Sequence, residues 1–204
     1  IEATYRQVSA LRDAGCDIVR LAIPDIEAAK TIYALKEKGV GIPLVADIHF
    51  DYKIALAAVD AGVDKIRINP GNSGSRERTE AVVRACREHK IPIRIGVNSG
   101  SVEKGLLEKY GSPTAEALAE SALLHAKILE ELDFSDVAIS VKASNVPTMI
   151  AANRLLAEQC NYPIHLGVTE AGARTRAVVK SSIGIGALLS EGIGDTLRVS
   201  LTED

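Results

Sequence analysis

Five apolar segments of this chain each carry one cationic residue inside a short run of Ile, Val and Leu. The segments are DIVRLAI, DKIRINP, IPIRIGVN, VAISVKAS and DTLRVSL, and their cations are Arg20, Arg67, Arg94, Lys142 and Arg198. Side chains alternate between the two faces of a β-strand, so each cation shares a face with the residue two positions on. That later residue is small or polar in most of the segments. The pattern predicts strands whose branched side chains face helices and whose cations face the opposite side.

In a closed parallel barrel, the side opposite the helices is the lumen. Cations gathered in one partly buried volume repel each other, and each costs several kcal/mol of desolvation unless an anion joins them. We therefore expect the five cations to converge on one pocket at the carboxyl ends of the strands, where barrel sites lie. A multiply charged anion is the predicted ligand, with phosphate as the leading candidate.

Helical and strand-like periods alternate along the whole chain, which indicates a parallel α/β architecture. Strands are predicted at residues 18–23, 43–50, 65–69, 91–97, 137–143, 163–169 and 196–201, and helices at about 2–14, 26–38, 52–61, 76–89, 113–132, 147–160 and 172–191. We predict a TIM-type (β/α)8 barrel that lacks its first strand and last helix and is open between the first and last predicted strands. A doubly wound open sheet is the alternative, but it gathers a ligand only at its switch point.

Length and composition exclude several classes of function for this chain. The 204 residues, 47% of them apolar, suffice for one domain that spans residues 1–204. A net charge of -3 and 3% aromatic residues argue against nucleic-acid binding. No apolar run approaches the roughly 20 residues of a membrane span, and no signal-peptide pattern opens the chain, so we expect a cytoplasmic protein without membrane contact. The three cysteines, Cys16, Cys86 and Cys160, are too scattered to predict disulfides or a metal site.

Polar residues with catalytic potential stand at the predicted strand ends. Asp47 and His49 in VADIHF share a face, and we interpret His49 as a residue that bonds a phosphate or moves a proton. The carboxylate of Asp47 either adjusts the proton affinity of His49 or pairs with a neighbouring arginine. Lys142 could be a phosphate partner, a Schiff-base nucleophile or a member of an ion pair. Glu170 in GVTEAG could donate a proton beside an anion or complement a helix dipole.

Two predicted strands end in turns rich in Gly, Asn and Ser. These are RINPGNSGS (67–75) and IRIGVNSGS (93–101), and in the second Asn98 has the parity of Arg94. Backbone N–H groups in such turns can hold an anion.

Six segments in a fixed order carry a resemblance to a known family: VADIHFDYKIAL, RINPGN, IPIRIGVNSGS, VKASN, GVTEAG and LLSEGIGDTLRVSLTED. Over essentially the whole chain they resemble the barrel domain of the 4-hydroxy-3-methylbut-2-enyl diphosphate synthases. That family reductively opens 2-C-methyl-D-erythritol 2,4-cyclodiphosphate to the linear allylic diphosphate on the methylerythritol phosphate route to isoprenoids. The resemblance implies an oxidoreductase with a [4Fe–4S] cluster, flavodoxin or ferredoxin as electron donor, and a homodimer.

The resemblance also implies roles for single residues. Glu170 is expected to face the reacting carbons as the catalytic residue. The diphosphate is expected to be held by Arg20, His49, Arg67, Arg94, Asn98, Lys142, Arg198 and Ser200.

The chain departs from the family at the cluster. The family holds its cluster with three Cys and a Glu of a separate C-terminal domain, and none of the cysteines here matches a cluster ligand. We therefore expect no metal ligand and no bound cofactor among these residues. By itself the chain is expected to bind substrate-like anions without turnover.

Residue chemistry alone leaves two other functions open. A class I aldolase-type barrel would form a Schiff base between Lys142 and a sugar phosphate. A non-catalytic phosphate-binding barrel would bind its ligand without chemistry. Borohydride trapping separates the aldolase from the reductive enzyme, which needs no imine.

Overall fold

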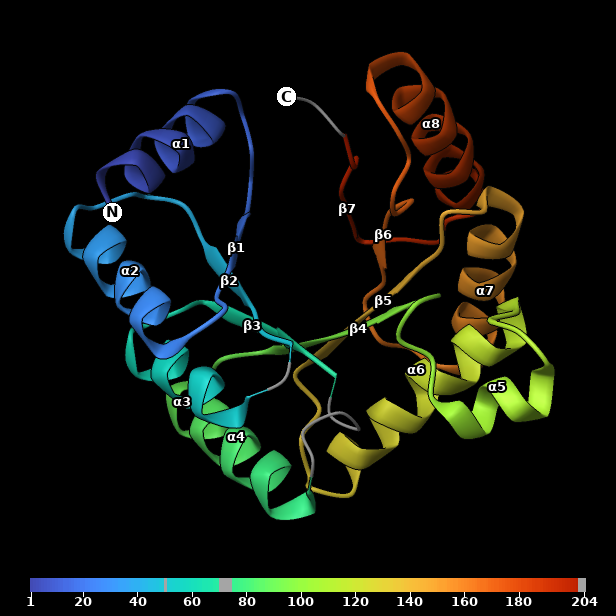
Figure 1. Cartoon of the computed structure of the whole chain (residues 1–204), viewed down its shortest axis with the longest axis horizontal. Coiled ribbons are helices and arrows are strands. Elements are labelled where there is room, and N and C mark those ends of the chain that lie inside the picture. The colour runs from blue at the N-terminus through green and yellow to red at the C-terminus, as the bar shows by residue number, and fades with distance from the viewer. Residues whose placement is uncertain (50, 70–74, 202–204) are drawn as a thin grey trace. The chain divides into compact units, whose positions relative to one another are not determined.

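The computed structural model describes residues 1–49, 51–69 and 75–201 (Figure 1). The chain groups into two compact units. Unit 1 consists of Ile1–Arg94 and Leu129–Asp136, and unit 2 consists of Ile95–Ile128 and Val137–Asp204. Each unit is built from parallel strands and helices that alternate along the sequence.

Unit 1 contains the first four helices and the strands between them. Its elements are α1 (Glu2–Asp13), β1 (Val19–Ala22), α2 (Ile26–Glu37), β2 (Leu44–Asp47), α3 (Tyr52–Asp60), β3 (Lys65–Ile68), α4 (Arg76–His89) and the start of β4 (Ile93–Asn98). β1 and β3 both pair with β2 in parallel, and β4 follows β3 in the sheet order. Figure 1 shows α1 to α4 on one side of these strands, which leaves the other side of the sheet to polar residues.

Short capping signals set where the helices of unit 1 begin. The carboxylate of Asp25 accepts the N–H of Ala28 at 2.7 Å, and Asp51 accepts the N–H of Lys53 at 2.9 Å. Each satisfies a backbone donor that the first helical turn would otherwise leave unpaired. The apolar faces of these helices then pack on the strands, with fully buried side chains such as that of Ile32.

Unit 2 continues the alternation. Its elements are the rest of β4, α5 (Lys104–Tyr110), most of α6 (Ala115–Glu130), β5 (Val137–Lys142), α7 (Val146–Gln159), β6 (His165–Leu166), α8 (Arg174–Ser190) and β7 (Thr196–Leu197). β5 follows β4 in the sheet order, a bridge between Ile139 and Ile164 links it to β6, and β6 pairs with β7 in parallel. The buried Asn153 of α7 donates to the carbonyl of Val141 at 3.1 Å and so fastens α7 to β5.

All seven predicted strands form, and the parallel α/β class is confirmed. The last two were predicted too long, because β6 and β7 each contain only two paired residues. Leu197 is 51% exposed, and Val199 and Leu201 are also about half exposed, since no helix follows β7 in the described residues. For β7 the expectation that branched residues face helices stays a prediction. The predicted gap in the barrel stays a prediction.

The sequence reading also missed one helix and misplaced another. α5 was not predicted, because it is only seven residues long and contains Gly105. The helix predicted at 113–132 begins at Ala115 instead, and Thr114 caps it by accepting the N–H of Ala117 at 3.3 Å. Across the described ranges, no helix combines the length and apolar character that crossing a membrane requires.

Candidate functional site

The strand register of unit 1 brings Arg20, Asp47 and Arg67 to one face of the sheet. Asp47 lies opposite Arg67 in the β2–β3 pair, and Arg20 lies opposite Val45, two residues before Asp47. Asp47 Oδ2 accepts from Arg20 Nη1 at 2.5 Å, and Asp47 Oδ1 accepts from Arg67 Nη1 at 3.1 Å. One carboxylate therefore holds two guanidinium groups from the neighbouring strands. This is the structural role that the sequence left open for Asp47.

His49 extends this cluster toward solvent. Its side chain is 56% exposed, whereas that of Asp47 is 7% exposed. Arg67 Nη1 lies 3.3 Å from His49 Nδ1, and because a guanidinium can only donate, Nδ1 acts as the acceptor. The ring proton then sits on Nε2, which lies 3.8 Å from Asp47 Oδ1. His49 can thus offer an N–H group to an anion at the exposed edge of the arginine pair.

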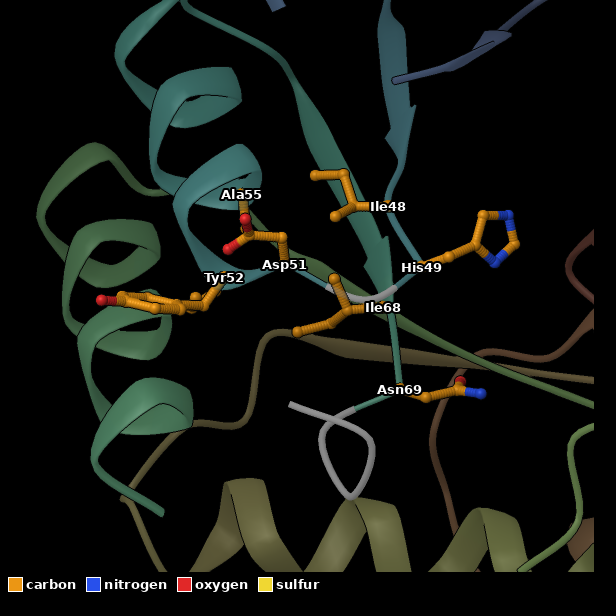
Figure 2. Close-up of a pocket in the computed structure, with 8 residues that line it drawn as sticks. Ile48, His49, Asp51, Tyr52, Ala55, Ile68 and Asn69 are labelled. Atoms are coloured by element: carbon orange, nitrogen blue, oxygen red, sulfur yellow. The ribbon is translucent and has the colours of Figure 1, made fainter. Parts of the chain in front are cut away.

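A small pocket beside these residues is too small for a diphosphate. Its volume is about 20 Å³, close to the space of one water molecule. It is lined by Ile48, His49, Asp51, Tyr52, Ala55, Ile68, Asn69 and Val82. Figure 2 shows the His49 ring and the Asn69 amide pointing to the same side, away from Tyr52 and α3. The side chains of His49 and Asn69, which could donate to an anion, therefore point away from the small pocket and from α3.

Two further cations belong to unit 1. Arg94 is 8% exposed on β4, and Lys65 begins β3 with the parity of Arg67. Burial of Lys65, followed by the charge of Arg94, lowers the pKa of the Lys65 ammonium. Cations therefore outnumber carboxylates among these side chains, and an added anion would relieve their repulsion. The spacing of two between Lys65 and Arg67 in DKIRINP is the sequence signal that these two cations share a face.

Unit 2 brings Lys142 and Arg198 together at Gly167. A Cβ atom on Gly167 would lie 2.9 Å from the carbonyl oxygen of Arg198 and 3.2 Å from Nζ of Lys142. The backbone N–H of Arg198 donates to Leu166 at 3.0 Å, which fixes this part of the chain against β6. Only glycine leaves room for the lysine head group to lie across this backbone. Gly167 therefore allows a close contact between Lys142 and the Arg198 backbone that the sequence reading overlooked.

A histidine and a threonine lie two residues before Gly167 and Arg198. His165 is 7% exposed, and its Nδ1 lies 2.8 Å from Thr196 Oγ1. The two residues are register partners in the β6–β7 pair, so they share the face of Gly167 and Arg198. They form a polar layer next to Lys142, and the alternation in PIHLGVT was a signal for it.

Glu170 stands in unusual backbone geometry between β6 and α8. Its φ is 49°, in the left-handed region that costs a residue with a side chain about 1–3 kcal/mol. α8 begins at Arg174 and has no acidic residue in its first turn, so Glu170 lies before the helix, and its choice between proton donor and helix-dipole partner stays a prediction. The side chain is exposed, as a group that meets a ligand would be.

The remaining predicted residues are found at strand ends of unit 2. Asn98 is the last residue of β4, and Ser200 follows β7; both are half-buried. The loop 67–75 falls largely outside the described residues. Convergence of all five cations on one pocket, which involves both units, stays a prediction.

The residues present do not fit an iron–sulfur cluster. Among residues 1–49, 51–69 and 75–201, no group of three or more His, Cys, Asp or Glu side chains could hold a metal ion. Burial raises the pKa of the Cys86 thiol to about 12, which disfavours the thiolate that a cluster needs. Cys16 and Cys160 are also free thiols.

Comparison with known sequences gives relatives along the whole chain. It is 63% identical to 4-hydroxy-3-methylbut-2-en-1-yl diphosphate synthase (flavodoxin) of Clostridium perfringens. It is 58% identical to the protein of the same name from Brevibacillus brevis and 59% identical to that from Symbiobacterium thermophilum. Each match spans all 204 residues of this chain but only 55 to 58% of the relative.

Solved structures with low sequence identity share the fold. A type I 3-dehydroquinate dehydratase from Clostridium difficile matches with a TM-score of 0.65 at 16% identity, over 97% of this chain and 78% of that one. A deoxyribose phosphate aldolase from Aeropyrum pernix matches with a TM-score of 0.61 at 13% identity, over 96% and 78%. Residues 1–204 also match, in full, the family described as the GcpE TIM-barrel domain. The predicted barrel class is thereby confirmed, and the chain belongs to the GcpE TIM-barrel domain family.

Proposed function

We propose that this chain is the substrate-binding barrel of an enzyme that reductively opens 2-C-methyl-D-erythritol 2,4-cyclodiphosphate to 4-hydroxy-3-methylbut-2-enyl diphosphate. The names of the relatives support the reaction. One observation in the chain itself carries the proposal: the buried Asp47 holds Arg20 and Arg67 on a face where cations are in excess. Such a face is stabilised by a multiply charged anion, and a diphosphate is one.

The proposed binding residues come from both units. From unit 1 they are Arg20, His49, Arg67 and Arg94, and from unit 2 they are Asn98, Lys142, Arg198 and Ser200. We propose that guanidinium and ammonium groups pair with the phosphate oxygens, while the Nε2–H of His49 and the two neutral side chains donate to them. Both units would then belong to one substrate-binding domain.

Glu170 is the proposed catalytic acid. Its strained backbone and exposed carboxyl group support a role at the reacting carbons. Loss of an oxygen substituent from carbon needs a proton for the departing water, and a carboxylic acid beside a diphosphate can supply one.

The electrons would come from outside these residues. We propose that the [4Fe–4S] cluster of the reaction is bound by ligands other than those described here, that flavodoxin or ferredoxin supplies its electrons, and that the working enzyme is a homodimer. The relatives' names, which specify flavodoxin, support the first of these donors. On this proposal the chain alone binds the cyclic diphosphate and yields no product.

Calorimetric titration of the chain with the cyclic diphosphate tests the proposal. Arg67→Gln should weaken binding about 10- to 150-fold, the equivalent of the roughly 1.5–3 kcal/mol of a hydrogen bond to a charged group. Arg154→Gln is the matched control, because Arg154 forms an exposed ion pair with Glu191 and should leave binding unchanged. Equal affinities for the two variants would contradict the proposed site. A covalent adduct at Lys142 after borohydride treatment with a sugar phosphate would favour an aldolase instead.

A further inference from the structure

The turn that follows β4 is organised around Asn98. Its Oδ1 accepts the N–H of Gly100 at 3.0 Å, and its carbonyl oxygen accepts the N–H of Ser101 at 2.9 Å. The backbone N–H of Asn98 donates to Ser101 Oγ at 3.0 Å. With Oδ1 committed to the turn, the side chain presents its Nδ2 group, which is a donor only. The conformation of residues 98–101 therefore decides where this donor points.

A part-buried contact between a carboxylate and a histidine fastens the next part of the chain. Glu103 immediately precedes α5, and its Oε1 contacts Nε2 of His125 on α6. The His125 side chain is 2% exposed, and that of Glu103 is 32% exposed. Burial opposes the charge of Glu103, but the backbone N–H of Glu103 and the contact with His125 outweigh it and lower the pKa of the carboxyl group. The carboxylate is thus held in its charged form at this point.

Packing alone does not require this pair. Apolar side chains already join the region, since Val102 and Leu106 are buried on either side of Glu103. A buried pair of ionisable groups stabilises a fold less than apolar groups of the same size would, because both groups lose hydration. Hydrogen bonds are directional, however, so this contact fixes the position of the backbone at Glu103 more closely than apolar packing would.

The contact between Glu103 and His125 lies close enough to Asn98 in the chain to restrict the turn. Only four residues separate Asn98 from Glu103, and the turn bonds take up those nearest Asn98. A short segment clamped at both ends has few free dihedral angles, so the clamp at Glu103 limits how the turn can move. We propose that Glu103 and His125 are positioning residues that hold the Asn98 turn in the geometry for diphosphate binding. This inference rests on the proposed function for its ligand, but not for the turn itself.

An ion pair between α5 and α6 supplies a control. Lys109 of α5 contacts Glu120 of α6 at 2.7 Å, and their side chains are 55% and 33% exposed. Figure 1 shows α5 beside α6. The Lys109–Glu120 pair lies at the far end of α5 from Asn98. Glu120→Gln should therefore loosen the helix contact without reaching the turn.

Hydrogen exchange of the chain without ligand is the first test. In His125→Ala, the amides of Gly100 and Ser101 should exchange at least about tenfold faster than in the wild type, because their turn is no longer clamped. His125→Gln, whose amide can replace Nε2 as a donor, should restore most of the protection. Glu103→Gln keeps the size of the side chain and serves if His125→Ala does not fold. Unchanged exchange at these amides in Glu103→Gln and His125→Ala, or equal acceleration in Glu120→Gln, would overturn the inference.

Binding of inorganic pyrophosphate is the second test. We expect His125→Ala to weaken it about tenfold in the wild-type background and to have no further effect when combined with Asn98→Ala. A full tenfold loss in the Asn98→Ala background would show that His125 does not act through the turn. If the wild-type chain does not bind pyrophosphate or the cyclic diphosphate, the proposed function fails, while the exchange measurement still decides whether the pair holds the turn.

Discussion

Replacing Asp47 by Asn tests the charge balance on the sheet face of unit 1. Asparagine has nearly the same shape, so the change removes a charge and leaves no cavity. Arg20 and Arg67 now bond different oxygens of the carboxylate, at 2.5 and 3.1 Å, so in the variant one of them faces the amide oxygen and the other faces the NH2 group, which cannot accept. We expect a less stable protein that an added anion restores.

The two contacts contribute unequally to the free energy of unfolding. The Arg67 side chain is 11% exposed, so its bond to the carboxylate should contribute about 1.5–3 kcal/mol, as hydrogen bonds to charged groups do. The Arg20 side chain is 34% exposed and can recover water, so its share should be at most about 1 kcal/mol. The free energy of unfolding should therefore fall by about 2–4 kcal/mol. In a chain of this length that lowers Tm by about 4–16 °C.

Thermal unfolding followed by circular dichroism, with and without pyrophosphate, measures both effects. Glu27→Gln is the control, because its ion pair with Lys30 is exposed on both sides and should matter little. Pyrophosphate at 100 times its Kd stabilises a folded protein by about 2.7 kcal/mol, and the gain should be at least as large in Asp47→Asn, where the anion replaces the lost charge. A loss below about 1 kcal/mol, or a smaller gain from pyrophosphate than in the wild type, would refute the reasoning.

Further outcomes are expected for substitutions of three glycines and for the thiol of Cys86. Gly167→Ala should shift both the backbone at Arg198 and the Lys142 head group, because the new Cβ would lie 2.9 Å from the Arg198 carbonyl oxygen and 3.2 Å from Lys142 Nζ; it should lower stability and weaken pyrophosphate binding about tenfold by calorimetry. Gly186→Ala in α8, where nothing lies within 4 Å, should instead raise stability by about 0.5–1 kcal/mol. Ellman's reagent at pH 8 should label two thiols of the native chain but not Cys86, because burial raises the pKa of its thiol to about 12. For the same reason stability should fall by about 1.4 kcal/mol per pH unit between about pH 8.5 and 12, where the unfolded thiol ionises and the folded one does not, and Cys86→Ala should remove this slope. Gly194→Ala should destabilise the fold strongly in urea titrations, because φ is 117° and the new Cβ would lie 2.4 Å from Leu166.

Much of the fold was predictable because its signals are local. The apolar period and a cap such as Asp25 placed α2 within a residue of its observed bounds. β6 was predicted too long, because the length of a strand depends on how much of it pairs with its neighbours, and the local apolar pattern does not specify that pairing. α5 escaped notice since seven residues with an internal glycine give too short a period to detect.

The site was predictable in its residue types but not in its contacts. Strand parity placed Asp47 and His49 on one face, yet the bonds from Asp47 to Arg20 and Arg67 depend on the register between neighbouring strands. The crossing of Lys142 over Gly167 depends on three segments far apart in the chain. Such contacts arise from tertiary packing, which no local pattern specifies.

The left-handed backbone of Glu170 has a consequence for experiments that rank variants by selection. Glycine adopts this conformation at no steric cost and asparagine tolerates it, so either substitution should relieve strain. A library of variants at position 170 screened for abundance or heat resistance should therefore enrich Gly and Asn over the natural residue. The same library screened for growth dependent on isoprenoid synthesis should deplete both. A position at which the two rankings run in opposite directions marks a residue retained for chemistry at the expense of the fold.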